Sequence, residues 1–276
     1  MAEQTSWLQI LTQCKDNVQK QIATLLKTLD KQQPNLGIGA GGDPIKRIDL
    51  AAENAIIKTL RSHKISFTLI SEESGIKEYG EAPQEHCVTA DPIDGTTNLM
   101  RGIPFYATSI AVSTQPTLNT IHTALVADLA HDVTYTAQRG KGAHRNNQKI
   151  TSSKSISLEE AVVGIDLNAY RIAPQLTGLI QKTKHIRHLG ANALELCYVA
   201  DGTTDAFIDI RGRLRATDMA AAWLIIKEAG AKITTSNGHP LNIKLDPKQK
   251  VAFIASATPK IHKAILNLIK TKKETK

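Results

Sequence analysis

The sequence predicts a mixed α and β protein of the α+β class, built from two unlike halves. In the first half, apolar residues recur at three- and four-residue steps from Trp7 to Leu29, which is typical of one helix face. Alternating or β-rich runs then follow one another from Ala107 to Gln138, as in neighbouring antiparallel strands. After a soft boundary near residues 150–157, helical and strand patterns alternate. We therefore expect an N-terminal half over residues 1–150 and a C-terminal half over residues 151–276.

Proline and glycine residues mark the boundaries of the elements expected in the first half. The first helix stops before Pro34, and a glycine-rich loop, Leu36–Pro44, follows it. The remaining expected elements are a helix at 46–63, strands at 67–70 and 86–90, a helical start after Thr96, strands at 107–114, 122–129 and 133–138, and a turn at 140–147.

In the second half, helical periodicity alternates with β-rich runs. One strong helix ends at Gly230, the residue type that most often follows a helix C-terminus. The expected elements are a strand at 158–165, helices at 173–183 and 192–199, a strand at 206–210, a helix at 216–229, a strand at 251–256 and a last helix at 261–269.

Composition narrows the class of function. The 276 residues are 41% hydrophobic and 22% charged, as in an ordinary soluble globular protein. Aromatic residues make up 4%, which disfavours a module that stacks nucleic-acid bases. The net charge is +8, and part of the excess lies in the tail Lys270–Lys276. The excess positive charge is either solvated without a functional role or steers an anionic substrate to a cleft. We expect no nucleic-acid partner, because no basic stripe or zinc-finger spacing occurs.

Cysteine usage and the hydropathy pattern predict the compartment. Three cysteines, Cys14, Cys87 and Cys197, lie far apart without a C-x-x-C pair, which favours a reducing cytoplasm. The start of the sequence lacks the basic segment of a signal peptide, and no apolar run is long enough to span a membrane. The prediction is a cytoplasmic protein with no membrane partner.

The stretch A-D-P-I-D-G-T-T-N, Ala90–Asn98, places two carboxylates, Asp91 and Asp94, three residues apart. Two ionised carboxylates that close repel each other unless a proton or a cation lies between them. Mg²⁺ prefers oxygen ligands, and a strand end with a tight turn can supply both carboxylates and the carbonyl of Ile93. Gly95–Thr97 would then open a helix whose free N–H groups can bind phosphate. A solvated acidic turn with a threonine cap explains this stretch alone equally well.

Four other acidic residues, in three segments, share that ambiguity when each segment is taken alone. Glu72 and Glu73 follow a buried strand and could simply form a charged loop. Asp49 and Asp218 each lie near a helix start, where the helix dipole favours a carboxylate. Their joint occurrence with the Asp91–Asp94 pair favours a metal site.

Together these segments resemble the inositol monophosphatase-like family of metal-dependent, lithium-sensitive phosphatases. Ser71–Ser74 matches its G/S-E-E-S segment, Asp91–Asn98 its D-P-I/L-D-G-T-T-N motif, and Thr217–Ala222 its later W-D-x-A-A-G helix. The segments Leu194–Ala200 and Asp205–Arg215 are similar to the archaeal branch, which acts on fructose 1,6-bisphosphate and inositol 1-phosphate. The resemblance implies a five-layer αβαβα sandwich of the sugar-phosphatase type, with most metal ligands in the first half, and a homodimer.

Two positions depart from the family pattern. Thr217 stands where a tryptophan usually precedes the last metal aspartate. In the glycine-rich loop Gly37–Asp43, Gly41 stands where the family often has an aspartate, and Asp43 comes two positions later. The departure weakens the expectation that this loop contributes to binding a third, weaker metal ion.

The resemblance implies a role for each matching residue. Two to three Mg²⁺ ions are expected, with Mn²⁺ as a candidate substitute, and a phosphate ester as substrate. The implied metal ligands are Glu72, Asp91, the Ile93 carbonyl, Asp94 and Asp218; the catalytic residues are Thr96, Asp49 and Glu72; the substrate-binding residues are Asp94, Gly95, Thr96, Thr97, Arg187, Ala191 and Asp209.

Other phosphatase classes have sequence signatures that this chain lacks. Haloacid-dehalogenase phosphatases use D-x-D-G-T, whereas here two residues separate the aspartates. Cys87 precedes no glycine or arginine loop that could hold a phosphate, which disfavours a cysteine phosphatase. Within the same fold, NADP(H) and 3′-phosphoadenosine 5′-phosphate are alternative substrates, and a non-catalytic binding protein is the alternative outside enzymes.

Overall fold

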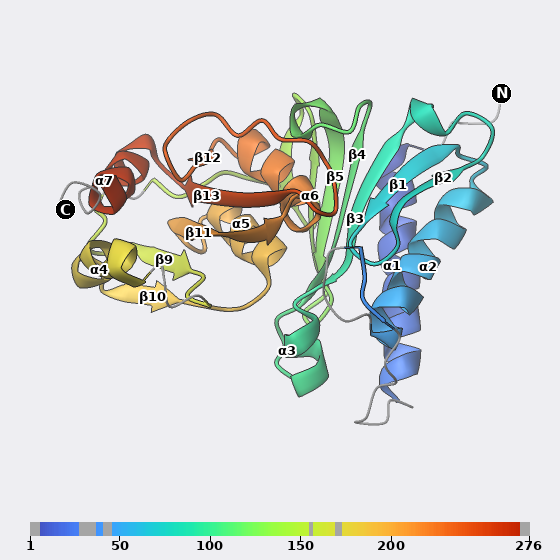
Figure 1. The fold of residues 1–276 in the computed structure, drawn as a ribbon, viewed down its shortest axis with the longest axis horizontal. Coiled ribbons are helices and arrows are strands. Elements are labelled where there is room, and N and C mark those ends of the chain that lie inside the picture. The colour runs from blue at the N-terminus through green and yellow to red at the C-terminus, as the bar shows by residue number, and fades with distance from the viewer. Residues whose placement is uncertain (1–5, 28–36, 41–45, 155–156, 169–172, 271–276) are drawn as a thin grey trace.

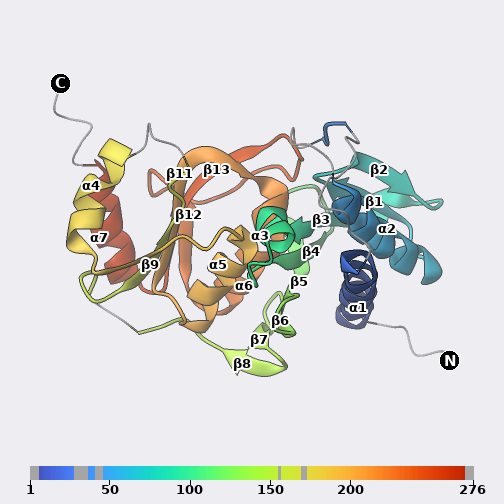
Figure 2. The same cartoon turned by 90° about the horizontal axis from the view of Figure 1, so that it is seen from below.

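The structure is a computed structural model that describes residues 6–27, 37–40, 46–154, 157–168 and 173–270. Its helices and sheets form five layers in the order α, β, α, β, α (Figure 1). Helices α1 and α2 form one outer layer and α4 and α7 the other, at opposite ends of the molecule (Figure 2). The predicted αβαβα sandwich is therefore confirmed. In the described residues, no helix has the length and apolar content that crossing a bilayer requires.

The first outer layer consists of α1 (Trp7–Leu26) and α2 (Arg47–Ser62), which pack on each other. The Ser6 hydroxyl accepts a hydrogen bond from the Gln9 N–H and the Gln9 side chain accepts one from the Ser6 N–H, so a capping box starts α1. The apolar face of each helix is buried, as its periodicity predicted. The predicted extension of the first helix to Leu29 lies outside the described residues.

The first sheet has eight strands in the order β2-β1-β3-β4-β5-β6-β7-β8. Only β1 and β3 pair in parallel among its strands, so the predicted antiparallel neighbours β4, β5 and β6 are confirmed. The strands are β1 (Phe67–Ser71), β2 (Gly75–Tyr79), β3 (Cys87–Asp94), β4 (Ala107–Ser113), β5 (Ile121–Asp128), β6 (Val133–Gln138), β7 (Gly142–Arg145) and β8 (Gln148–Ile150), with short 3₁₀ turns at Pro83–Glu85 and Leu118–Thr120.

The turn predicted at 140–147 is wrong for much of its length. Residues Gly142–Arg145 form β7, which pairs with β6 and then with β8. The range holds two turns: Arg139–Lys141 joins β6 to β7, and the two-residue loop Asn146–Asn147 joins β7 to β8. Both asparagines have positive φ, as a tight hairpin turn of the primed type requires. The glycines and polar residues of this stretch have low strand propensity, so the sequence did not indicate the strand that pairing with β6 and β8 stabilises.

The central layer consists of α5 (Asn192–Asp201) and α6 (Ala216–Glu228). Helix α6 contacts strands of both sheets and is buried from Ala216 to Ile226. A helix that is apolar on all sides needs such a fully buried position. The short helix α3 (Thr96–Arg101) projects below this layer in Figure 1.

The second sheet has five strands in the order β10-β9-β11-β13-β12. Strand β9 pairs in parallel with β10 and β11, and the remaining pairs are antiparallel. The remaining elements are β9 (Val162–Ile165), α4 (Ala173–Lys182), β10 (His185–Arg187), β11 (Ala206–Arg215), β12 (Lys232–Thr235), β13 (Lys250–Ser256) and α7 (Pro259–Lys270).

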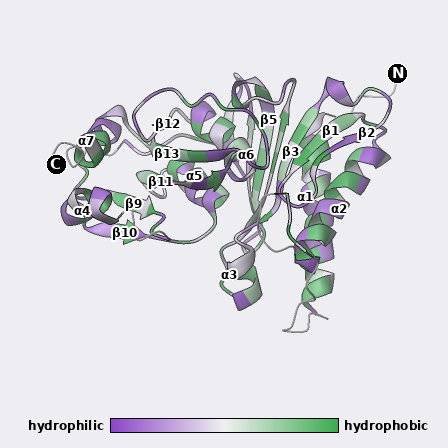
Figure 3. Ribbon diagram, viewed as in Figure 1, coloured by the Kyte–Doolittle hydropathy of each residue, from purple (hydrophilic) through white to green (hydrophobic). Residues whose placement is uncertain are grey.

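Hydrophobic residues follow the central strands, and hydrophilic residues mark the outer surfaces of the helices (Figure 3). The strands of the first sheet lie between residues 67 and 150 and those of the second between residues 162 and 256. Because α6 packs on the first sheet although it belongs to the C-terminal half, the two halves share one core layer. The division into residues 1–150 and 151–276 stays a prediction.

Candidate active site

A β-bulge at the end of β3 lets Asp91 and Asp94 face the same region. Residues three apart on a regular strand point to opposite faces of the sheet. Here Asp91 pairs with Ser109 and Asp94 with Ala107, so β3 has one extra residue relative to β4. The register shift explains how two aspartates with this spacing converge.

Gly95 turns the chain sharply from β3 into α3. Its φ is +85°, in the left-handed region that favours glycine. A Cβ at this position would lie 3.0 Å from the Ala191 Cβ and 3.1 Å from the Phe105 carbonyl oxygen. Glycine therefore allows both the turn and the close approach of the segment before α5.

Three carboxylates from separate elements meet beside this turn. Glu72 lies in the β1–β2 turn, Asp91 in β3 and Asp218 in the first turn of α6, and one ligand oxygen of each lies within 4.8 Å of the others. Burial raises the pKa of Asp91 well above its usual value, and the neighbouring Glu72 and Asp218 raise it further. An all-oxygen, electron-rich donor set of this kind fits a hard divalent cation such as Mg²⁺.

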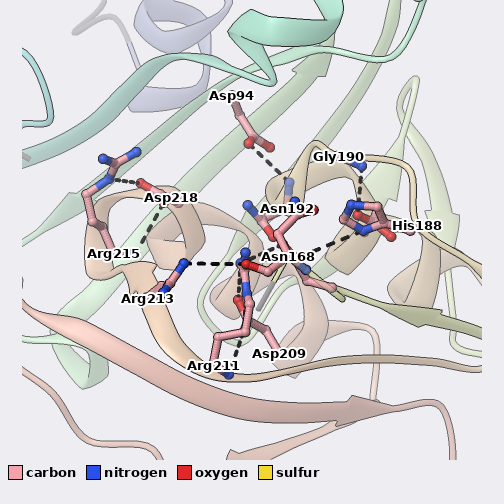
Figure 4. A network of polar contacts seen from close by, with 12 residues as sticks. Asp94, Asn168, His188, Gly190, Asn192, Asp209, Arg211, Arg213, Arg215 and Asp218 are labelled. Carbon is pink, nitrogen blue, oxygen red and sulfur yellow. Dashed lines mark hydrogen bonds and ion pairs between the residues drawn. The ribbon is translucent and has the colours of Figure 1, made fainter. Parts of the chain in front are cut away.

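Asp94 faces the start of α5. Its two carboxylate oxygens accept hydrogen bonds from the N–H groups of Asn192, at 3.1 Å, and Ala193, at 2.6 Å (Figure 4). Burial raises the pKa of Asp94, the Asp218 charge adds to the rise, and the two N–H groups oppose it. Each oxygen retains a lone pair with which Asp94 could ligate a cation.

Arg215 is a functional candidate that the sequence did not identify. Its guanidinium lies 2.6 Å from Glu72 Oε1 (Nη2) and 3.2 Å from Asp218 Oδ1 (Nε). The sequence clues are its position three residues before Asp218 and its place at the end of the segment Asp205–Arg215, which is similar to the archaeal branch. The side chain places one positive charge among the cluster of acids.

Asp49 and Thr96 meet on the other side of the cleft. The Thr96 hydroxyl lies 3.1 Å from Asp49 Oδ1 and 2.9 Å from the Ile93 carbonyl oxygen, and its single proton can serve one of them at a time. Burial raises the pKa of Asp49 to about 6, and Lys46 and Thr96 oppose that shift. This pair provides a hydroxyl whose proton can move toward a buried carboxylate.

These groups line one cleft of about 390 Å³. Ala191 is fully buried behind its neighbours Gly190 and Asn192, which line the cleft. Lys46, Glu73 and Arg215 also line it, although none of the three was among the predicted site residues. The predicted site residues in the lining are Asp49, Glu72, Asp91, Ile93, Asp94, Gly95, Thr96, Thr97 and Asp218.

Two predicted substrate contacts, Asp209 and Arg187, do not line the cleft. Asp209 is fully buried, and Arg211 donates to it through Nε at 2.9 Å and Nη2 at 2.6 Å (Figure 4). Arg211 Nη2 also lies 2.5 Å from Asp166 Oδ2. Arg187 is exposed and donates to the carbonyl of Ile186. Their substrate roles stay predictions.

Part of the glycine-rich loop docks on the Glu72 turn. The Ala40 N–H donates to the Glu73 carbonyl at 3.1 Å. A Cβ at Gly39 would lie 3.2 Å from the Glu72 carbonyl oxygen, so the approach is close. The departures noted at Gly41 and Asp43 lie outside the described residues.

The αβαβα layers and the converging carboxylates define the class of the protein: a layered α and β protein with an acidic cleft that suits a divalent cation. The model of the inositol monophosphatase family matches residues 5–274. The chain therefore belongs to the inositol monophosphatase family.

Individual relatives agree with this assignment. The fructose-1,6-bisphosphatase/inositol-1-monophosphatase of Methanothermobacter thermautotrophicus is 33% identical over 271 residues, covering 95% of this chain and 96% of that protein. The bifunctional NADP phosphatase/NAD kinase of Methanococcus maripaludis is 36% identical over 274 residues and 91% of this chain, which spans 48% of that relative's length. A crystal structure of an inositol monophosphatase–fructose 1,6-bisphosphatase has a TM-score of 0.85 at 32% identity, covering 96% of this chain and 100% of the other.

Proposed function

We propose that this protein is a Mg²⁺-dependent phosphomonoester hydrolase that acts on small sugar or polyol phosphates, fructose 1,6-bisphosphate and/or inositol 1-phosphate. The observation that carries the proposal is the convergence of Glu72, Asp91 and Asp218 beside the turn into α3. Carboxylates that repel one another need a cation, and a cation beside free helix N–H groups is a site for a phosphate ester.

The residues that would hold two to three Mg²⁺ ions are Glu72, Asp91, the Ile93 carbonyl, Asp94 and Asp218. Bound ions would neutralise phosphate charge and lower the pKa of a water molecule, making it a nucleophile near neutral pH. Arg215 lies against Glu72 and Asp218, so its charge holds these two carboxylates near each other.

Thr96 and Asp49 would orient the attacking water and receive its proton. When the Thr96 hydroxyl donates to Asp49, its lone pairs are free to accept a hydrogen bond from water. Buried Asp49, with a pKa of about 6, can accept a proton more readily than an ordinary aspartate. The N–H groups of Gly95, Thr96 and Thr97, at the start of α3, would bind the phosphate oxygens.

NADP(H) is the second candidate substrate, because the relative from Methanococcus maripaludis carries that activity in its name. Both NADP(H) and 3′-phosphoadenosine 5′-phosphate carry an adenine, and none of the described residues that line the cleft is aromatic, which favours sugar and polyol phosphates over either. We also propose a cytoplasmic homodimer with no nucleic-acid or membrane partner, from the composition and the family resemblance.

The test is phosphate release by the purified full chain from each candidate substrate, with Mg²⁺ and with EDTA. We expect turnover of a sugar or polyol phosphate only with the metal, and its loss in Asp94→Asn. Selective turnover of NADP(H) would show that the substrate is this dinucleotide and not a sugar or polyol phosphate. If no ester were hydrolysed, a non-catalytic binding protein would be favoured.

A further inference from the structure

Glu53 is a second buried carboxylate on α2, one helical turn beyond Asp49. The two side chains are 3% and 4% exposed, and residues four apart share one face of a helix. A buried carboxylate is unfavourable unless its oxygens find hydrogen-bond donors. The groups that donate hydrogen bonds to Glu53 therefore indicate its role.

Glu53 is hydrogen-bonded to both ends of the turn that carries Glu72. The Ser71 hydroxyl donates to Glu53 Oε2, and the Ser74 backbone N–H donates to the same oxygen at 3.3 Å. The Ser71 oxygen also accepts from the Glu73 N–H at 3.4 Å. Because Ser71 precedes Glu72 and Ser74 closes the turn, one carboxylate oxygen fastens the whole segment to α2.

The turn itself needs such an attachment. Ser71 and Gly75 pair across β1 and β2, which leaves a three-residue connection ending at a glycine with φ of +77°. Asp91 and Asp218 belong to a strand and a helix, whereas Glu72 lies in this turn. The direction of the Glu72 carboxylate therefore depends on how the turn is held.

We propose that Glu53 is a positioning residue: its bonds to Ser71 and Ser74 hold the Glu72 turn so that the Glu72 carboxylate meets Asp91 and Asp218 at one cation. The inference rests on the proposed metal-dependent function. Groups that orient a metal ligand through hydrogen bonds typically change metal affinity by about 10–100-fold when they are removed.

The experiment is calorimetric titration of the purified full chain with Mg²⁺, without substrate, for Glu53→Ala, Glu53→Gln and the unsubstituted protein. Glu53→Ala removes the acceptor, and we expect the dissociation constant for Mg²⁺ to rise about 10–100-fold. Glu53→Gln keeps an acceptor oxygen for both donors, so its dissociation constant should stay within about threefold. In activity assays, Glu53→Ala should need more Mg²⁺ but recover most of its kcat at saturation.

Asp205→Ala is the matched control. Asp205 also accepts two hydrogen bonds, from the Val162 N–H and the Ser153 hydroxyl, but does so beside the second sheet. It should lose stability without changing the affinity for Mg²⁺. If Glu53→Ala does not fold, Ser71→Ala, which removes the hydroxyl that donates to Glu53 and accepts from the Glu73 N–H, must weaken Mg²⁺ binding in its place.

Unchanged Mg²⁺ affinity in the folded Glu53→Ala protein, or in Ser71→Ala where only that variant folds, would overturn this inference alone. Absence of Mg²⁺ binding by the unsubstituted protein would overturn the proposed function and the inference together.

Discussion

Two clusters of buried acids in this protein are neutralised in different ways. In the second sheet, Asp209 and Asp166 share Arg211, whose planar guanidinium contacts both carboxylates. In the cleft, Arg215 is in contact with Glu72 and Asp218, but it lies in a lining with four further acidic side chains. Figure 4 shows Arg211 with Asp209 and Arg215 with Asp218.

The difference teaches which cluster needs a ligand. Asp166 and Asp209 share one arginine, so this cluster is nearly balanced within the chain and is destabilised when one member is removed. The cleft has six acidic side chains against two basic ones, and this larger excess of negative charge needs added protons or cations, as the raised pKa of Asp91 indicates. Four predictions test this contrast, from the largest expected effect to the smallest.

Asp91→Asn should reduce kcat by at least about 10³-fold, because the cleft loses a ligand that no other side chain replaces. The free energy of unfolding without metal should stay equal or rise, since a carboxylate with a raised pKa destabilises the folded state when it is ionised. Steady-state kinetics and urea unfolding in EDTA measure the two effects. Asp128→Asn, a buried acid outside the cleft lining, is the control that should keep its activity. A marked loss of metal-free stability in Asp91→Asn would contradict the contrast.

Arg211→Met should lower the free energy of unfolding by about 3–5 kcal/mol, because it leaves Asp209 and Asp166 buried without their cation. Urea unfolding of the metal-free protein is the measurement. Arg213→Met is the matched control, since Arg213 is exposed and, among the described residues, donates to the Asn168 carbonyl at 3.4 Å; it should change stability by less than about 0.5 kcal/mol. Equal effects of the two substitutions would show that the pairing is not structural.

His262 illustrates a third way of burying a polar group, in which the group stays uncharged. It is 1% exposed between Thr234 and Ser256, and burial, assisted by Lys232, lowers its pKa from 6.5 to about 4. Because the folded-state pKa is the lower one, protonation favours unfolding: the stability is fully present above pH 6.5 and is lost as the pH falls toward 4. The difference corresponds to about 3 kcal/mol.

Urea unfolding from pH 7 to 4 checks this prediction when the wild-type curve is compared with that of His262→Gln. The difference between the curves isolates the histidine from the carboxylates that titrate in the same range. Parallel curves would mean that His262 is charged in the folded protein or reaches solvent.

Mg²⁺ at 100 times its dissociation constant should raise the free energy of unfolding by about 2.7 kcal/mol. The increment should be retained in Arg211→Met, whose defect lies outside the cleft, and largely lost in Asp91→Asn. Thermal unfolding with and without the metal measures it. If Mg²⁺ stabilised Arg211→Met but not the unsubstituted protein, the cation site would lie at the Arg211 cluster and not in the cleft.

Much of the cleft could be predicted from local chemistry. The spacing of Asp91, Asp94 and the Gly95–Thr97 turn predicted a strand that ends in acids and enters a helix, and the structure has that arrangement. Asp49 and Asp218 were assigned through the family resemblance, because a helix start alone explains a carboxylate equally well. Glu53 and Arg215 were not, because neither position has a local pattern that distinguishes it from an ordinary surface charge.

The sequence by itself determined the main helices and the antiparallel run of the first sheet, because periodicity and turn residues act between neighbours in the chain. It supplied the acids of the cleft as motifs of a family, each ambiguous when taken alone. Only the tertiary structure decided that Asp209 is paired with Arg211 and that β7 is a strand. These outcomes depend on contacts between segments far apart in the sequence, where burial and charge pairing, rather than local preference, select the partner.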